Sequence, residues 1–139
     1  MRHVISVQDF SAEEIIDILD RAETMVDIAK GEAVSEVLKG KVLAAIFFEP
    51  STRTRLSFET AMNRLGGAVI GFAGTEATSV VKGETIAHTI RMFTAYDDAD
   101  LFTHPREGAA KLATQYSDVP ILNAGDSAAQ HPTQTIINK

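Results

Sequence analysis

From Val42 onward, short apolar runs alternate with helical patterns, and this alternation restricts the fold more than any other feature. Each apolar run has the length of a buried strand, and each is followed by apolar residues at helical spacing. Strands are predicted at Val42–Phe48, Ala68–Ala73, Ala99–Thr103 and Val119–Asn123, and helices at Thr52–Leu65, Glu84–Tyr96, Glu107–Gln115 and from about Thr133. Strands joined by helices run parallel, so the sequence predicts an α/β fold: a four-stranded parallel sheet with helices on both faces.

A further helix is predicted ahead of the first strand. Ser11 and Glu14 form a capping-box pattern at its start, and Lys30-Gly31 is typical of its end. The segment between them carries apolar residues at helical spacing, at Ile15, Ile18, Leu19, Ala22, Met25, Val26 and Ala29. We therefore expect one face of this helix to be part of the core.

Length, charge and composition exclude several functional classes. The 139 residues suit one domain, spanning 1–139, and the net charge of −6 argues against nucleic acid as a partner. The sequence has no cysteine, so it offers neither a disulfide nor a thiolate metal site. We expect a cytoplasmic protein that is not associated with a membrane, because no apolar run approaches about 20 residues and no signal-peptide core follows Met1. The four histidines lack the spacing of a metal site.

The segment Ser51-Thr52-Arg53-Thr54-Arg55 is the strongest functional signal in the chain. It follows the first strand and opens a helix, so free backbone N–H groups and the positive end of the helix dipole meet there. Hydroxyls donate to phosphate oxygens and a guanidinium binds two of them at once. We interpret the segment as a phosphate site; the alternative is a capped helix with solvated arginines.

Three other segments also follow predicted strands, where ligands bind in parallel α/β sheets. In the loop before the second helix, composition alone favours a solvent-exposed Lys82, and His88 within that helix is also expected to face solvent. His104 and Arg106 follow the third strand and are ambiguous as anion ligands.

After the fourth strand, small residues lead to His131 at a helix start, with Gln134 one turn later. An imidazole N–H and an amide in this arrangement can both bind a polar ligand. A capped helix with an exposed histidine is the alternative, and we favour the functional interpretation because the segment lies beside the phosphate loop.

Together, the Ser-Thr-Arg-Thr-Arg segment, the His-Pro-Thr-Gln segment from His131 and the Leu-Asn-Ala-Gly-Asp segment from Leu122 resemble one family. It is the aspartate/ornithine carbamoyltransferase family, and the likeness is to the amino-terminal, carbamoyl-phosphate-binding domain of its catalytic chain. The resemblance extends over essentially the whole chain. It implies a three-layer, Rossmann-like domain and a transfer of the carbamoyl group from carbamoyl phosphate to L-aspartate, in pyrimidine biosynthesis, without a metal or other cofactor. Glu49-Pro50 and Lys82-Gly83-Glu84 are more similar to the aspartate branch than to the ornithine branch.

The resemblance also implies roles for particular residues. The phosphate cradle would be Ser51, Thr52, Arg53 and Thr54, with Arg53 neutralising the leaving phosphate. Thr54 and His131 would donate to the carbamoyl oxygen, and Gln134 would hold the carbamoyl amine. Ser79 and Lys82 would enter the active site of a neighbouring subunit in a homotrimer, which makes Lys82 catalytic rather than merely exposed. A regulatory chain is a further partner that the family allows.

Two departures from the family separate the competing hypotheses. Thr103 stands where the family usually has an arginine that contacts carbamoyl phosphate, so we expect Thr103→Arg to tighten binding of that ligand. The family's second domain, which binds aspartate, is absent from the 139 residues. The chain is therefore predicted to be the first half of an aspartate carbamoyltransferase; the alternative is a non-catalytic module that binds phosphate or carbamoyl phosphate.

Overall fold

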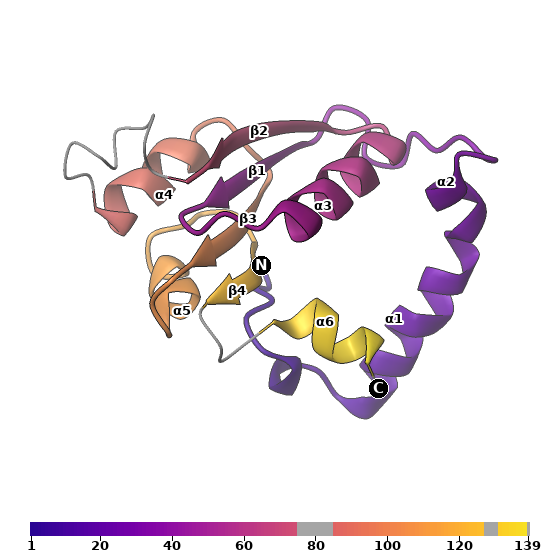
Figure 1. Cartoon of the computed structure of the whole chain (residues 1–139), viewed down its shortest axis with the longest axis horizontal. Helices are drawn as coiled ribbons and strands as arrows, with labels where there is room; N and C mark the ends of the chain where they lie inside the picture. The colour runs from indigo at the N-terminus through magenta and orange to yellow at the C-terminus, as the bar shows by residue number, and fades with distance from the viewer. Residues whose placement is uncertain (75–84, 127–130, 139) are drawn as a thin grey trace.

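The computed structural model, which describes residues 1–74, 85–126 and 131–138, contains the predicted parallel sheet. Its four strands lie in the order β2-β1-β3-β4, and each neighbouring pair is parallel (Figure 1). The strands are β1 Val42–Phe47, β2 Ala68–Ala73, β3 Ala99–His104 and β4 Ile121–Asp126. The predicted fold class is thus confirmed. The predicted end of the fourth strand at Asn123 is wrong, because β4 continues to Asp126.

Helices cover both faces of the sheet, as the alternating pattern predicted (Figure 1). One face packs against α3 Thr52–Arg64, and the other packs against α4 Ile86–Thr94 and α5 Ala109–Ala113. The last described helix is α6 Pro132–Ile137, which begins with a proline in its first turn. The amino-terminal part consists of the 3-10 helix η1 Val7–Asp9 followed by α1 Ala12–Thr24 and α2 Val26–Lys30.

The core has two halves because successive side chains of β1 point to opposite faces of the sheet. Ile46 and Phe102 face α4, where Ile90 and Phe93 are also buried. Phe47 and Leu101 face α3 and contact Met62. Ile86, Ile90 and Phe93 of α4 pack against the core, and His88 is exposed as expected.

Leu56, Ala61 and Leu65 are the apolar residues whose helical spacing predicts the buried face of α3, but the helix turns another face to the sheet. Leu56 and Ala61 are exposed, Leu65 is half-buried, and the helix packs through Phe58 and Met62 instead. Phe58 and Met62 are four residues apart and therefore lie one above the other on the same face of the helix.

Gly71 allows β2 to approach β1 closely. Its φ of +133° is a conformation that residues with a Cβ rarely adopt. A Cβ at this position would also run into the backbone carbonyl of Ala45, its partner in the parallel register. The glycine is therefore required by both the backbone conformation and the strand spacing.

The amino-terminal helix differs from its prediction in two respects. It is broken at Met25 into α1 and α2, although its capping box at Ser11 and Glu14 and its left-handed Gly31 end are as predicted. Neither helix buries a residue, and Leu19 and Val26 are exposed. The expected core face is wrong for this chain, because α1 and α2 lie beside the sheet as an arm rather than on it (Figure 1).

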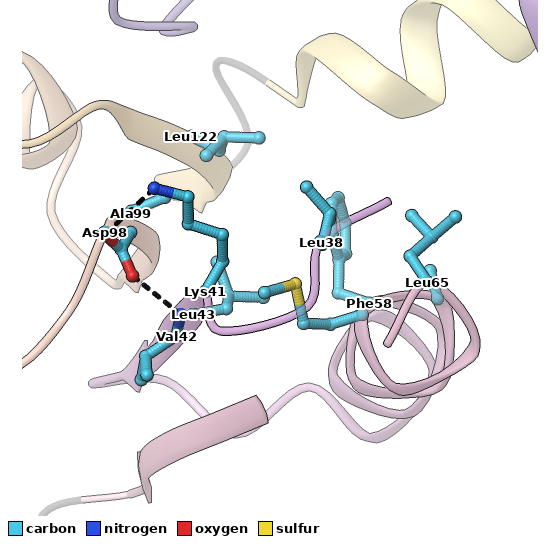
Figure 2. A pocket seen from close by; sticks show the side chains of 11 residues that line it. Leu38, Lys41, Val42, Leu43, Phe58, Leu65, Asp98, Ala99 and Leu122 are labelled. Carbon is cyan, nitrogen blue, oxygen red and sulfur yellow. Dashed lines mark hydrogen bonds and ion pairs between the residues drawn. The ribbon is translucent and has the colours of Figure 1, made fainter. Parts of the chain in front are cut away.

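An apolar hollow lies between α3 and the amino-terminal ends of β1 and β3, with a volume of about 490 Å³ (Figure 2). Phe58, Leu65 and Leu38 form one wall, and Leu122 of β4 lies opposite. The polar groups at its rim are already paired: Asp98 forms an ion pair with Lys41 at 3.7 Å and accepts the backbone N–H of Val42 at 2.8 Å. This hollow therefore presents few polar groups to a small anion.

The third predicted helix starts later than its sequence suggested. We expected it to begin at Glu107, but α5 begins at Ala109 after Gly108, which has a φ of +81°. The segment in between forms a turn because its groups bond to other segments. The ring nitrogen Nδ1 of His104 accepts the N–H of Arg106 at 2.9 Å, and Asp126 accepts the N–H of Gly108 at 3.0 Å.

Among residues 1–74, 85–126 and 131–138, no helix has both the length and the apolar character needed to cross a membrane.

Candidate functional site

The sheet contains one switch point, and the candidate site lies there. From β1 the chain proceeds to β2 on one side, while β3 lies on the other side. Ligands of such sheets bind at the carboxyl ends of the strands beside this reversal. Phe47 and Thr103 are register partners at these ends, so the switch point brings Thr103 beside the segment that leads from β1 into α3.

Ser51 and the first turn of α3 present unused donors at this point. Ser51 occupies the N-cap position, but its side chain makes no capping hydrogen bond. The first turn has no acidic residue to compensate the helix dipole, and its leading backbone N–H groups have no partner within the helix. The arrangement supports the predicted interpretation of Ser51–Thr54 as an anion site.

The two arginines of the segment differ in their environment. Arg55 is held by Glu59 one turn later, with 2.7 Å between its Nε and the carboxylate. Arg53 is exposed and, within the described part of the chain, has no hydrogen bond or ion pair. The guanidinium available to a ligand is therefore that of Arg53.

A hollow of about 440 Å³ brings the two predicted motifs together. Arg53 and Thr54 of α3 lie on one side, and His131 and Gln134 of α6 lie on the other. The remaining lining residues are Ser57, Phe58, Ala61, Thr133 and Ile137. Two segments separated by more than 70 positions in the sequence thus supply a cation, hydroxyls, an imidazole and an amide to one hollow.

His131 is suited to donate from a neutral ring. Burial lowers the pKa of His131, because the protonated ring would lose solvation. Its Nδ1 lies 3.4 Å from the hydroxyl of Thr133. Gln134 currently donates its amide to Asn138 at 3.3 Å, a bond that a ligand in the hollow would have to replace.

A second hollow, of about 250 Å³, continues the site toward β3. Ser51 and His131 line it together with Thr103, which is only 3% exposed. The remaining lining residues are Glu49, Pro50, Ala124 and Gly125. Thr52 and Ser51 also line a neighbouring hollow of about 350 Å³ on the side of β2. Ser51 and His131 thus each border two adjoining cavities.

Not every predicted residue reaches this place. Ser79 and Lys82 lie outside the described residues. His104 packs instead between Phe48 and Phe102, with ring centroids 5.1 and 6.0 Å away, on the face that carries α4. Arg106 is exposed and lines none of the hollows of about 440, 250 and 350 Å³, so it does not stand in for an arginine at position 103.

Sequence reasoning missed a polar network that fixes the end of β4. Asp126 accepts from the side chain of Asn123 at 3.3 Å and from the backbone N–H of Gly108 at 3.0 Å. Asn123 in turn donates to the carbonyl of Ile5 at 3.1 Å and accepts the N–H of Gly125 at 2.9 Å. The buried pair joins β4 to the turn before α5. In the sequence, Asn123 and Asp126 belong to the Leu122–Asp126 segment, which resembles the family but implies no role for either residue.

Among the residues that the structure describes, no three side chains of the metal-binding types come together as a metal site. Among the described residues that line it, the 440 Å³ hollow offers hydrogen-bond donors and the guanidinium of Arg53.

Fold and site together define a doubly wound α/β domain with a hollow at its switch point, lined by Arg53, Thr54, His131 and Gln134. The sequence matches, over residues 2–138, the family described as aspartate/ornithine carbamoyltransferase, carbamoyl-P binding domain. The chain belongs to the aspartate/ornithine carbamoyltransferase family.

Relatives named as aspartate carbamoyltransferase catalytic subunits match nearly the whole of this chain. The aspartate carbamoyltransferase catalytic subunit of Methanothrix thermoacetophila is 56% identical over 99% of this chain and 45% of its own length. The one from Archaeoglobus fulgidus is 55% identical over 99% of this chain and 46% of its own length. The chain thus spans somewhat less than half the length of the curated relatives it matches.

Solved structures of aspartate transcarbamoylases superpose closely on this chain. The catalytic subunit of M. jannaschii aspartate transcarbamoylase superposes with a TM-score of 0.91 at 52% identity, over 99% of this chain and 45% of that one. Aspartate transcarbamoylase from Trypanosoma cruzi, in complex with carbamoyl phosphate and aspartate, gives a TM-score of 0.92 at 39% identity, again over 99% and 45%.

Proposed function

We propose that this chain is the carbamoyl-phosphate-binding half of an aspartate carbamoyltransferase. The observation that carries the proposal is the single hollow shared by Arg53 and Thr54 from α3 and by His131 and Gln134 from α6. It combines a free guanidinium and hydroxyls, which suit a phosphate, with an imidazole and an amide, which suit a carbamoyl group. The complex of the Trypanosoma cruzi relative with carbamoyl phosphate and aspartate supports the same ligands.

Each residue then has a role that follows from its chemistry. Ser51, Thr52 and the first backbone N–H groups of α3 hold the phosphate oxygens, and Arg53 neutralises the charge of the leaving phosphate. Thr54 and neutral His131 donate to the carbamoyl oxygen, where negative charge develops as the carbon is attacked. Gln134 orients the carbamoyl amine.

The proposed reaction joins the amine of L-aspartate to the carbamoyl carbon. The new C–N bond forms as the bond between the carbamoyl carbon and the phosphate oxygen breaks, the amine gives up a proton, and phosphate leaves. Fixing both substrates in line supplies a large part of the rate. We assign aspartate binding to the part of the relatives' length that this chain does not span.

The remaining assignments follow the family. Ser79 and Lys82 complete the site of a neighbouring subunit, which requires a homotrimer with shared sites. A regulatory chain is a possible partner of the assembled enzyme. The setting is cytoplasmic pyrimidine biosynthesis.

Calorimetric titration of this chain with carbamoyl phosphate, or with a stable phosphonate analogue, tests the binding proposal. We expect micromolar binding that Arg53→Ala weakens by roughly ten- to more than hundred-fold, because a charge-assisted contact is lost. Arg21→Ala, an exposed arginine of α1, is the matched control and should leave the dissociation constant unchanged. Equal affinity of the Arg53→Ala variant and the parent would refute the assignment.

The alternative is a module that binds carbamoyl phosphate without transferring its carbamoyl group. Thr103 in place of the family's arginine favours it. The two are separated by adding L-aspartate to the titrated complex after the chain has been joined to the remaining part of a relative's catalytic subunit: release of phosphate and appearance of N-carbamoyl-L-aspartate support the enzyme, whereas binding without turnover supports the module.

A further inference from the structure

Thr103 makes an unusual connection between β3 and the segment that enters the phosphate loop. Its hydroxyl donates to the backbone carbonyl of Glu49 at 3.0 Å, and its own carbonyl accepts the N–H of Phe48 at 3.2 Å. One residue of β3 therefore holds both Phe48 and Glu49 after they have left β1. The side chain is 3% exposed, so the hydroxyl is largely shielded from water, which strengthens its hydrogen bond.

The carbonyl that Thr103 holds belongs to the peptide bond preceding Pro50. Proline has no N–H and a fixed φ, so the Glu49–Pro50 peptide sets the direction in which the chain reaches Ser51. On the side of β2, the chain is held two residues earlier than Glu49. There the N–H of Gly74 donates to the carbonyl of Phe47 at 2.7 Å. Among the described residues, the hydroxyl of Thr103 makes the last hydrogen bond from the sheet to this lead-in before α3 begins.

Thr103 also lines the 250 Å³ hollow beside Ser51, which raises the question of direct ligand contact. A threonine hydroxyl has one proton, and here Glu49 accepts it. The hydroxyl is left with acceptor lone pairs only, which repel a phosphate oxygen. The side chain is therefore built to fix the backbone and not to bind the anion.

We propose that Thr103 is a positioning residue for the phosphate loop, acting through the carbonyl of Glu49 to place Ser51 and the first turn of α3. The proposal rests on the proposed function of that loop. The family pattern assigns no role to a threonine at this position. An arginine there cannot make the same bond, because its side chain begins with methylene groups and has no hydroxyl.

Titration with the phosphonate analogue tests this on three variants. Thr103→Val keeps the shape and removes the hydroxyl, and we expect binding about 3- to 10-fold weaker, the usual range for one hydrogen bond. Thr103→Ser keeps the hydroxyl and should restore the parent's affinity. Thr103→Ala also lacks the hydroxyl but places no methyl against the Glu49 carbonyl, so it replaces the valine variant if that one does not fold.

Thr114→Val is the matched control, because the hydroxyl of Thr114 also donates to a backbone carbonyl, that of Lys111, but far from the loop. It should leave the affinity unchanged. Amide ¹H–¹⁵N shifts of Ser51–Thr54 give a readout without ligand: we expect them to move in the hydroxyl-free variants and to return in Thr103→Ser. Equal affinity and unchanged shifts in Thr103→Val and Thr103→Ala would overturn the positioning role. Failure of the parent chain to bind would instead refute the function proposed above.

Discussion

At the scale of single residues, the identity of residue 103 decides between a neutral hydrogen bond to Glu49 and a charged contact with the phosphate. A threonine here holds the Glu49 carbonyl with a hydrogen bond of about 0.5–1.5 kcal/mol, whereas an arginine reaching the bound phosphate adds about 1.5–3 kcal/mol. The charged contact is the larger of the two. The adjoining 250 Å³ hollow gives the longer side chain room beside Ser51.

Thr103→Arg is therefore expected to tighten carbamoyl-phosphate binding, although it breaks the bond to Glu49. The net gain is roughly 3- to 10-fold, measured as the ratio of dissociation constants by titration. Thr103→Leu provides the control, since it also breaks the bond but adds no charge and should weaken binding. A dissociation constant for Thr103→Arg as weak as that of Thr103→Leu would show that an arginine at position 103 does not reach the phosphate.

At the scale of elements, the close pairing of β1 and β2 depends on Gly71. Two costs would follow from a side chain there: the strain of a φ of +133° and the overlap of the new Cβ with the carbonyl of Ala45. Ala45 belongs to β1, which pairs with a strand on each side, so its carbonyl cannot move without disturbing the sheet.

We expect Gly71→Ala to lower the free energy of unfolding by roughly 2–4 kcal/mol, as the sum of strain and overlap. Gly40→Ala separates the two contributions, because Gly40 also has a positive φ, of +81°, but nothing lies within 4 Å of its added Cβ. Gly40→Ala should lower the free energy of unfolding by about 1–2 kcal/mol, from strain alone. Denaturant unfolding measures both, and equal losses would mean that the overlap is relieved.

At the scale of the whole molecule, the end of the sheet opposite the candidate site contains a buried acidic pair. Both carboxylate oxygens of Asp97 and one of Asp100 are buried and, among the described residues, have no hydrogen-bond partner. Burial raises the pKa of Asp97 to about 9, and the neighbouring Asp100 adds to the effect. Burial also raises the pKa of Asp100, although Ser117, which donates to it at 3.2 Å, and His3 oppose the rise. The two carboxyls are best satisfied by sharing a proton.

This pair makes stability depend on pH in a definite direction. The unfolded aspartates release their protons near pH 4, while the folded pair keeps one to a much higher pH. The stabilisation from the pair is therefore complete at low pH and is lost as pH rises toward about 9. Asp98 is the other charged group facing Asp97, and its charge increases the effect.

Asp97→Asn mimics the protonated state and should flatten the fall in unfolding free energy between about pH 5 and pH 8, while raising the stability at the upper end. Asp20→Asn, on the exposed surface of α1, controls for the loss of one negative charge. Denaturant unfolding at several pH values measures the slopes. A slope equal to that of the parent would mean that the pair carries no shared proton.

Local patterns determined the order of the elements and the parallel sheet, and they singled out the Ser51–Thr54 and His131 segments. Strand and helix periodicity, caps such as Ser11 with Glu14, and the pairing of hydroxyls with arginines are all properties of neighbouring residues. Only the tertiary structure decided which face of a helix is buried and what each polar group bonds to. Leu56 is exposed because α3 packs through Phe58 and Met62, and α1 exposes its apolar face because it lies beside the sheet. Thr103 holds Glu49, 54 positions away, because β1 and β3 are register partners, and no local pattern encodes such a contact.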